Sequence, residues 1–182
     1  MAKILLAASA SVAVYKACDL ASKLTQDGHA VRAILTRRAA ELVNPQLFEA
    51  VTSEPAFVDE FDAARRGAMD HIDLAKWGDL FLAAPATADL VARFAHGLAD
   101  DLVTTVALAL PVTTPKLVSP AMNPSMLAQP AVRRNLAQLS ADGWQVIDPD
   151  SGPMACGDAG QGRLPEPAAL VERVRHVLAK RG

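Results

Sequence analysis

Small residues and hydroxyl groups follow two of the short apolar runs in this sequence. Ser9, Ala10 and Ser11 follow the run Ile4–Ala8, and Thr87 lies in the turn PATADL after a later run. Small residues let a backbone approach a ligand closely, and hydroxyls beside a helix N-terminus suit one phosphate group. The first turn lacks the GxGxxG pattern of dinucleotide sites, so the two turns together favour a mononucleotide. Flavin mononucleotide (FMN) fits, because its ring is flat and apolar and its phosphate is single. A plain turn of small residues is the alternative.

Two further runs end in side chains that could serve the same place. Thr36 ends the second run, and Asn123 ends the stretch Pro120–Asn123 after another. In an open α/β sheet, ligands bind outside the carboxyl ends of the strands. We therefore expect these side chains to converge at one edge of a sheet. Asp89 has a simpler interpretation, as the N-cap of the helix that follows.

His71 is the histidine with the most suggestive surroundings. It stands between Asp70 and Asp73, whose carboxylates would favour the imidazolium form. A lone histidine is more often a surface residue or a satisfied core residue, so this context alone does not establish catalysis. The other histidines lie at helix ends or in a charged helix, where the context is weaker.

Cys156 lies in the one long segment without periodicity, residues 150–167, which is rich in glycine and proline. A segment of this length within a domain is typically a functional flap or disordered. A glycine-dense loop is poor core material, so this thiol is a candidate functional group. Cysteine has an ordinary pKa of about 8.5, which suits a proton donor better than a nucleophile at neutral pH. Cys18, inside an expected helix, is interpreted as a core residue.

These candidates need a scaffold, and the hydropathy pattern predicts one in which strands alternate with helices. The expected strands are short and mostly apolar, as in a parallel sheet covered on both faces. They span residues 4–8, 31–36, 80–84, 116–119 and 145–147. The expected helices span residues 14–25, 89–96, 101–110, 125–141 and 168–180. Residues 1–182 are therefore predicted to form one α/β domain, a Rossmann-like (flavodoxin-like), doubly wound parallel sheet in three layers.

Composition excludes several classes of function. The 182 residues carry 18 Lys and Arg against 20 Asp and Glu, a net charge of −2, which argues against nucleic-acid binding. Aromatic residues make up only 4%, so base-stacking platforms are not expected. Two cysteines cannot form a disulfide framework or a cysteine-rich zinc site, and no metal centre is expected. No apolar run reaches the roughly 20 residues of a membrane span, and we expect a cytoplasmic protein.

The N-terminus admits two interpretations. Lys3 followed by an apolar stretch of small residues resembles a short signal peptide, but the same stretch is typical of a first buried strand. The apolar spacing from Ala17 to Leu24 then predicts one face of a packed helix. We favour the strand, because a cleaved leader would not need this continuation.

Five pieces of the chain together resemble the homo-oligomeric flavin-containing cysteine decarboxylase family, and the resemblance covers nearly the whole sequence. They are SVAVYK at 11–16, HIDLAKW at 71–77, APATADL at 84–90, PAMN at 120–123, and ACGD at 155–158 with its following glycines. The resemblance implies FMN as the cofactor and a Rossmann-like subunit. It also implies trimers, or dodecamers built from them, in which the histidine enters a neighbour's active site.

The matching motifs also imply roles for individual residues. His71 would be the catalytic base, Asn123 would bind the substrate carboxylate, and Cys156 would donate a proton in the second half-reaction. The implied FMN-binding residues are Ser9, Ala10, Ser11, Thr36, Pro85, Ala86, Thr87, Asp89, Ala121 and Met122. The implied substrate-binding residues are Asn123, Met126, Ala155, Gly157 and Arg163.

The activity that this resemblance implies is a carboxy-lyase reaction of coenzyme A biosynthesis. FMN-dependent oxidative decarboxylation of 4′-phospho-N-pantothenoylcysteine would yield an enethiol, which is then reduced to 4′-phosphopantetheine. The motifs leave two alternatives open: a decarboxylase of peptides that end in cysteine, and a non-catalytic FMN-binding regulatory subunit. Bacterial members of the family often continue into a synthetase domain, so a chain ending at Gly182 would be a standalone enzyme or one part of a longer protein.

Overall fold

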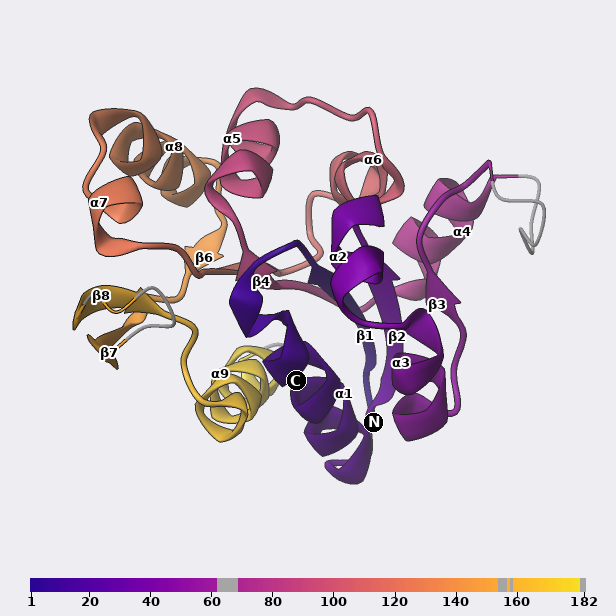
Figure 1. The fold of residues 1–182 in the computed structure, drawn as a ribbon. Helices are drawn as coiled ribbons and strands as arrows, with labels where there is room; N and C mark the ends of the chain where they lie inside the picture. Colours follow the sequence, from indigo (N-terminus) through magenta and orange to yellow (C-terminus); the bar gives the residue numbers. More distant parts are fainter. Residues whose placement is uncertain (62–68, 154–156, 158, 181–182) are drawn as a thin grey trace.

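The computed structural model describes residues 1–61, 69–153, 157 and 159–180 of the chain. Over these residues, a six-stranded parallel sheet lies between two layers of helices (Figure 1). The strands are β1 (Lys3–Ala8), β2 (Ala30–Leu35), β3 (Ala56–Phe57), β4 (Leu80–Ala86), β5 (Lys116–Pro120) and β6 (Gln145–Val146). Their order is β3-β2-β1-β4-β5-β6, and each neighbouring pair is parallel. This is a doubly wound sheet, and without the short β3 its order is that of flavodoxin, so the predicted fold is confirmed.

The sheet forms because its central strands are apolar along almost their whole length. β1 has the sequence KILLAA and is buried from its second residue, and every residue of β4 is buried. Strands that helices cover on both faces have this uniform pattern. β1 pairs with β2 on one side and β4 on the other, which confirms the N-terminal stretch as a strand at the centre of the sheet.

Two groups of helices cover the two faces. One core lies against α1 (Tyr15–Gln26), α2 (Arg37–Leu42), α3 (Pro45–Thr52) and α9 (Pro167–Ala179). The other lies against α4 (Asp70–Trp77), α5 (Ala88–His96), α6 (Leu102–Ala109) and α8 (Pro130–Ala141). A short helical turn, η1 (Val12–Val14), precedes α1, and the one-turn helix α7 (Pro124–Leu127) precedes α8.

The structure corrects two of the predicted elements. The single helix expected over residues 125–141 is wrong: it is divided into α7 and α8, because Pro130 cannot extend a helix and instead begins the second one. The described part of the segment 150–167 is also more regular than a loop, since β7 (Asp150–Pro153) and β8 (Ala159–Arg163) pair as an antiparallel hairpin. The helices α2, α3 and α4 and the strand β3 were not among the predicted elements.

Cys18 lies on α1, partly buried against the first core, and burial raises the pKa of its thiol above the usual range. The second core contains three packed rings, although aromatic residues are rare in the chain. Phe81 meets Phe94 and Trp144 edge to face, with ring centroids 6.0 and 5.9 Å apart, and the latter two rings stack at 4.7 Å. This cluster links β4, α5 and the turn between α8 and β6, so it contributes strongly to stability.

We expect Phe81→Ala to lower the free energy of unfolding by about 3–5 kcal/mol, because it removes a fully buried ring and leaves a cavity. Urea denaturation followed by circular dichroism measures the change. Phe61→Ala is the matched control, since that ring is 79% exposed and should cost no more than about 0.5 kcal/mol. Equal losses for the two variants would contradict the packing described here.

Candidate active site

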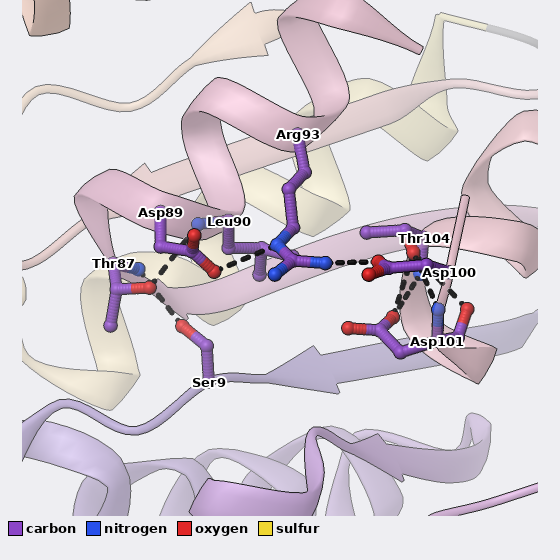
Figure 2. Close-up of polar contacts among 8 residues, drawn as sticks. All are labelled: Ser9, Thr87, Asp89, Leu90, Arg93, Asp100, Asp101 and Thr104. Carbon is purple, nitrogen blue, oxygen red and sulfur yellow. Dashed lines mark hydrogen bonds and ion pairs between the residues drawn. The ribbon is translucent and has the colours of Figure 1, made fainter. Parts of the chain in front are cut away.

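The hydroxyl of Ser9 joins the carboxyl ends of β1 and β4. Its Oγ donates a hydrogen bond to the carbonyl oxygen of Pro85 at 2.9 Å. The same oxygen accepts the N–H of Thr87 at 2.9 Å, as Figure 2 shows. Ser9 is only 2% exposed, so this side chain is committed to the junction between the two strands. The turn after β1 and the N-terminus of α5 are therefore held at a fixed separation.

A cavity of about 430 Å³ opens at this junction. Four parts of the chain form it: the turn after β1 with the start of α1, the N-terminus of α5, the turn after β5, and the hairpin β7–β8. The described residues that line it are Ala10, Ser11, Val12, Ala13, Tyr15, Lys16, Thr87, Ala88, Ala121, Met122, Asn123, Met126, Pro153, Gly162, Arg163 and Leu164. The cavity thus lies where a doubly wound sheet is expected to bind its ligand, at the reversal of strand order.

Helix N-termini and apolar side chains meet in this cavity. Ser11 Oγ accepts the N–H of Ala13 at 3.3 Å and caps η1, while Thr87 Oγ1 accepts the N–H of Leu90 at 3.3 Å and caps α5. The remaining first-turn N–H groups of a helix have no partner within it and favour an anion. Together with the apolar wall, this donor set fits a flat ring that carries a single phosphate.

Asn123 stands at the N-cap of α7, directly after β5. Its Oδ1 accepts the N–H of Ser125 at 2.8 Å, which fixes the side chain beside the cavity. The hairpin is attached at the same place, because the N–H of Met122 donates to the carbonyl oxygen of Gly162 at 3.0 Å. A Cβ atom on Gly160 would lie 3.0 Å from Cγ of Pro124, so the missing side chain lets β8 pack closely on α7.

Two cations and one anion line or border the cavity on its α9 side. The Lys16 ammonium lies 2.7 Å from Oε1 of Glu166, and Nη2 of Arg163 lies 3.6 Å from the same oxygen. The hydrogen bond from Lys16 is the main reason that the pKa of Glu166 lies below its usual range. The carboxylate therefore stays ionised and holds two positive groups near the cavity.

Two of the residues expected to bind FMN, Asp89 and Thr36, make contacts of their own within the protein. The simpler interpretation of Asp89 as the N-cap of α5 is wrong. Thr87 is the N-cap, and Asp89 pairs with Arg93 at 2.9 Å (Figure 2). Arg93 also contacts Asp100, which ties α5 to the segment before α6. Thr36 caps α2 by accepting the N–H of Ala39 at 3.2 Å. Neither Asp89 nor Thr36 is among the described residues that line the cavity.

Pro85 and Ala86 lie within the buried strand β4, and they contribute backbone to the junction. The carbonyl oxygen of Ala86 accepts the N–H of Ala121 at 3.0 Å, which aligns the turn after β5 with that after β4. Ala121 and Met122 line the cavity, as do Ala10, Ser11 and Thr87.

His71 lies at some distance from this cavity within the same protomer. It is the second residue of α4, and Figure 1 places α4 on the opposite side of the molecule from α7. Its Nδ1 lies 2.6 Å from Oε2 of Glu60, a contact that the sequence did not predict. One protomer therefore does not bring His71 together with Asn123.

Of the other residues expected in the site, Cys156 and Ala155 lie outside the described residues. Gly157 is described and exposed, and it is not among the residues given above as lining the cavity. Met126 and Arg163 do line it, next to Asn123. Within the described ranges, no helix is long and apolar enough to cross a membrane, and no cluster of His, Cys, Asp or Glu is placed to hold a metal ion.

Sequence reasoning missed Lys16 and Tyr15, which line the cavity, and Glu60, which pairs with His71. Lys16 and Tyr15 could have been found, because they are the first two residues of α1, which follows Ser11 and the short turn η1. Glu60 carries no such signal, since it stands outside any motif and eleven positions before its partner in the sequence.

The chain matches proteins of one family along most of its length. The family model described as Flavoprotein matches residues 1–179. The coenzyme A biosynthesis bifunctional protein CoaBC of Bacillus subtilis is 44% identical over 169 residues, which cover 93% of this chain and 41% of that protein. A probable phosphopantothenoylcysteine decarboxylase of Streptococcus mutans is 40% identical over 176 residues, covering 97% of this chain and 98% of that protein.

Solved structures agree with these matches. A cysteine-to-serine variant of PPC decarboxylase, complexed with pantothenoylaminoethenethiol, aligns with a TM-score of 0.86 and 30% identity over 98% of both chains. Other matching structures are described as FMN-dependent cysteine decarboxylases or as an FMN-binding protein. The chain spans 41% of the length of the Bacillus subtilis relative, so the activities of that whole protein are not carried over. The resemblance drawn from the motifs is confirmed, and the chain belongs to the Flavoprotein family.

Proposed function

We propose that this chain is an FMN-dependent carboxy-lyase that converts 4′-phospho-N-pantothenoylcysteine to 4′-phosphopantetheine in coenzyme A biosynthesis. The observation that carries the proposal is the cavity, which joins Asn123, Met126 and Arg163 to the small-residue turns after β1 and β4. The choice of substrate is supported by relatives named for phosphopantothenoylcysteine decarboxylase or CoaBC at 40 and 44% identity.

FMN is the cofactor that the cavity suits. Ser11, the N-terminus of α5 at Thr87, and the apolar surface of Ala121 and Met122 would hold it. Ser9, Pro85 and Ala86 would act through the backbone they arrange, and Ala10 through its small size. When bound, FMN supplies the two-electron chemistry that oxidises the cysteinyl end of the substrate and later reduces the enethiol.

Asn123 would orient the carboxylate that leaves as CO₂. Its amide can donate a hydrogen bond to a carboxylate without carrying a charge of its own. A lysine or arginine would instead stabilise the carboxylate as an ion pair and oppose its loss. In the cap on α7 the side-chain oxygen Oδ1 accepts the N–H of Ser125, and the amide nitrogen is the hydrogen-bond donor of the same side chain.

His71 would act as the catalytic base in the site of a neighbouring protomer. The separation of α4 from the cavity within one protomer supports a homo-oligomer, a trimer or a dodecamer of trimers, whose active sites lie at subunit interfaces. Cys156 would supply the proton for reduction of the enethiol, and the glycine-rich flap 150–167 would close over the substrate. Residues 1–182 would form one FMN-binding domain, and the enzyme would be cytoplasmic.

The alternative substrate is a peptide with a C-terminal cysteine. It is kept because structures described as FMN-dependent cysteine decarboxylases share the fold at 29 and 31% identity. A non-catalytic FMN-binding subunit is the third possibility, and the presence of His71, Asn123 and Cys156 in the sequence argues against it.

Purified protein should be yellow, and it should release CO₂ from phosphopantothenoylcysteine with 4′-phosphopantetheine as the product. A peptide ending in cysteine should be turned over far more slowly. Absorbance in the blue measures the flavin, and mass spectrometry identifies the thiol product of each assay. Preferential turnover of the peptide would select the alternative enzyme, whereas a yellow protein inactive on both substrates would select the regulatory subunit.

Asn123→Asp should reduce kcat/KM for phosphopantothenoylcysteine on the order of 100-fold, because it sets a negative charge against the substrate carboxylate and removes a donor. FMN content should stay unchanged. Asn135→Asp on α8 introduces the same charge away from the cavity and serves as the control. Unchanged turnover in Asn123→Asp would mean that another group holds the carboxylate.

His71→Asn should abolish oxidation of the substrate while the protein retains its FMN, because the base is removed without change to the described cavity lining. Single-turnover bleaching of the flavin absorbance measures this step. His176→Asn, at an exposed position of α9, controls for the loss of an imidazole. Loss of flavin from His71→Asn alone would instead make His71 a structural residue.

A further inference from the structure

Glu60 and His71 form a close pair outside the cavity. The Glu60 carboxylate oxygen Oε2 lies 2.6 Å from Nδ1 of His71, within the range of a strong charge-assisted hydrogen bond. The two side chains are 20 and 25% exposed, so water competes only partly for this contact. Nδ1 faces the carboxylate, and a carboxylate can only accept a hydrogen bond. The neutral imidazole in this geometry therefore carries its proton on Nδ1.

The segment that carries Glu60 is itself anchored. The preceding residue, Asp59, contacts Arg37 at the start of α2, and its Oδ1 accepts the N–H of Phe61 at 3.0 Å. These interactions, the Phe61 hydrogen bond first, lower the pKa of Asp59 below its usual range. Asp59 thus remains ionised near neutral pH and holds the turn that presents Glu60 to α4.

We propose that Glu60 is a positioning residue for His71: it accepts the Nδ1 proton, fixes the tautomer and ring orientation, and leaves the lone pair of Nε2 free to accept a proton. The proposal rests on the proposed function for the role of His71 as the base. When Nε2 takes up a proton from the substrate, the imidazolium is paired at once with the Glu60 carboxylate, which stabilises the charge formed. A carboxylate paired with a histidine acts in this way in other enzymes.

A second histidine, His29, provides an internal reference for the tautomer of His71. Nδ1 of His29 accepts the N–H of Ala2 at 3.3 Å, and its Nε2 lies 3.4 Å from Asp27. A nitrogen that accepts a hydrogen bond cannot carry a proton, so neutral His29 must be protonated on Nε2. The two histidines are therefore expected to hold opposite tautomers in one protein.

Glu60→Gln tests the role of the carboxylate with little change in size. We expect kcat to fall roughly 10- to 100-fold, with KM and FMN content unchanged, because the amide neither pairs the imidazolium nor enforces one tautomer. Glu60→Asp keeps the charge and should recover part of the loss. Glu54→Gln is the matched control. Glu54 pairs with Arg32, which lies over the Trp77 ring at the far end of α4 from His71, so removing the Glu54 carboxylate should leave kcat unaltered.

Nuclear magnetic resonance on protein labelled with ¹⁵N-histidine tests the tautomer independently of turnover. The chain contains only 4 histidines, and His71→Asn assigns the relevant signal. At alkaline pH the wild-type His71 signal should report the Nδ1–H form and that of His29 the Nε2–H form. Glu60→Gln should shift only His71 toward a mixture.

The outcomes separate this inference from the proposed function. A His71 signal in the Nε2–H form, or unchanged kcat and tautomer in Glu60→Gln, would overturn the role of Glu60. An equal loss of kcat in Glu60→Gln and Glu60→Asp without a tautomer change would make Glu60 merely structural, which also overturns it. Failure of the wild type to decarboxylate phosphopantothenoylcysteine would sink the proposed substrate, while the tautomer measurement would still decide whether Glu60 positions the imidazole.

Discussion

The hydroxyl of Ser9 sets the geometry on which the candidate active site depends. It spans the two strands between which the winding of the sheet reverses, and both of its hydrogen bonds are made inside the protein. Because Ser9 is buried, water does not compete for the groups that make these hydrogen bonds, and the two turns keep their spacing. The residues that face the cavity can then be small, since the backbone is already placed. This explains how alanines and short hydroxyl side chains can build a site for a large aromatic cofactor.

The chemistry proposed for this protein is divided between two places in one protomer. The cavity has the groups suited to holding a cofactor and a carboxylate, while His71, which pairs with Glu60, belongs to α4. Figure 1 shows α4 on the opposite side of the molecule from α7. Since His71 lies away from the cavity of its own protomer, it could act as a base only in the cavity of another copy of the chain. In the proposed oligomer, each protomer would therefore be both a holder of substrate and a donor of the base to its neighbour.

Local periodicity predicted the fold well, and the reasons for the misses are physical. Strands buried on both faces appear in the sequence as apolar runs, so β1, β2, β4 and β5 were predicted to within two residues at each end. β3 and β6 each have only two residues in the sheet, too few for a period to show; the expected strand 145–147 coincides with β6, whereas β3 was missed. The helix expected over 125–141 failed because the pattern on both sides of Pro130 was treated as continuous, although proline punctuates it.

The candidate site was predictable where its residues directly follow a strand of the central sheet. Ser11, Thr87, Met122 and Asn123 lie just after their strands, and the topology of a parallel sheet brings such positions together. Glu60 could not be predicted, because its contact depends on how a turn anchored by Asp59 passes α4. The acidic neighbours visible in the sequence, Asp70 and Asp73, are not the carboxylates that meet the His71 ring in the hydrogen bond described.

Gly160 packs directly against Pro124, so only the backbone of β8 separates the hairpin from the start of α7, next to Asn123. Any larger residue at 160 would act as a spacer there and lift β8 away from α7. The cleft would widen even though Gly160 is not among its described lining residues. A relative that must admit a bulkier thiol acid could therefore change its selectivity through a larger residue at position 160 alone, with every group that touches the ligand left as it is.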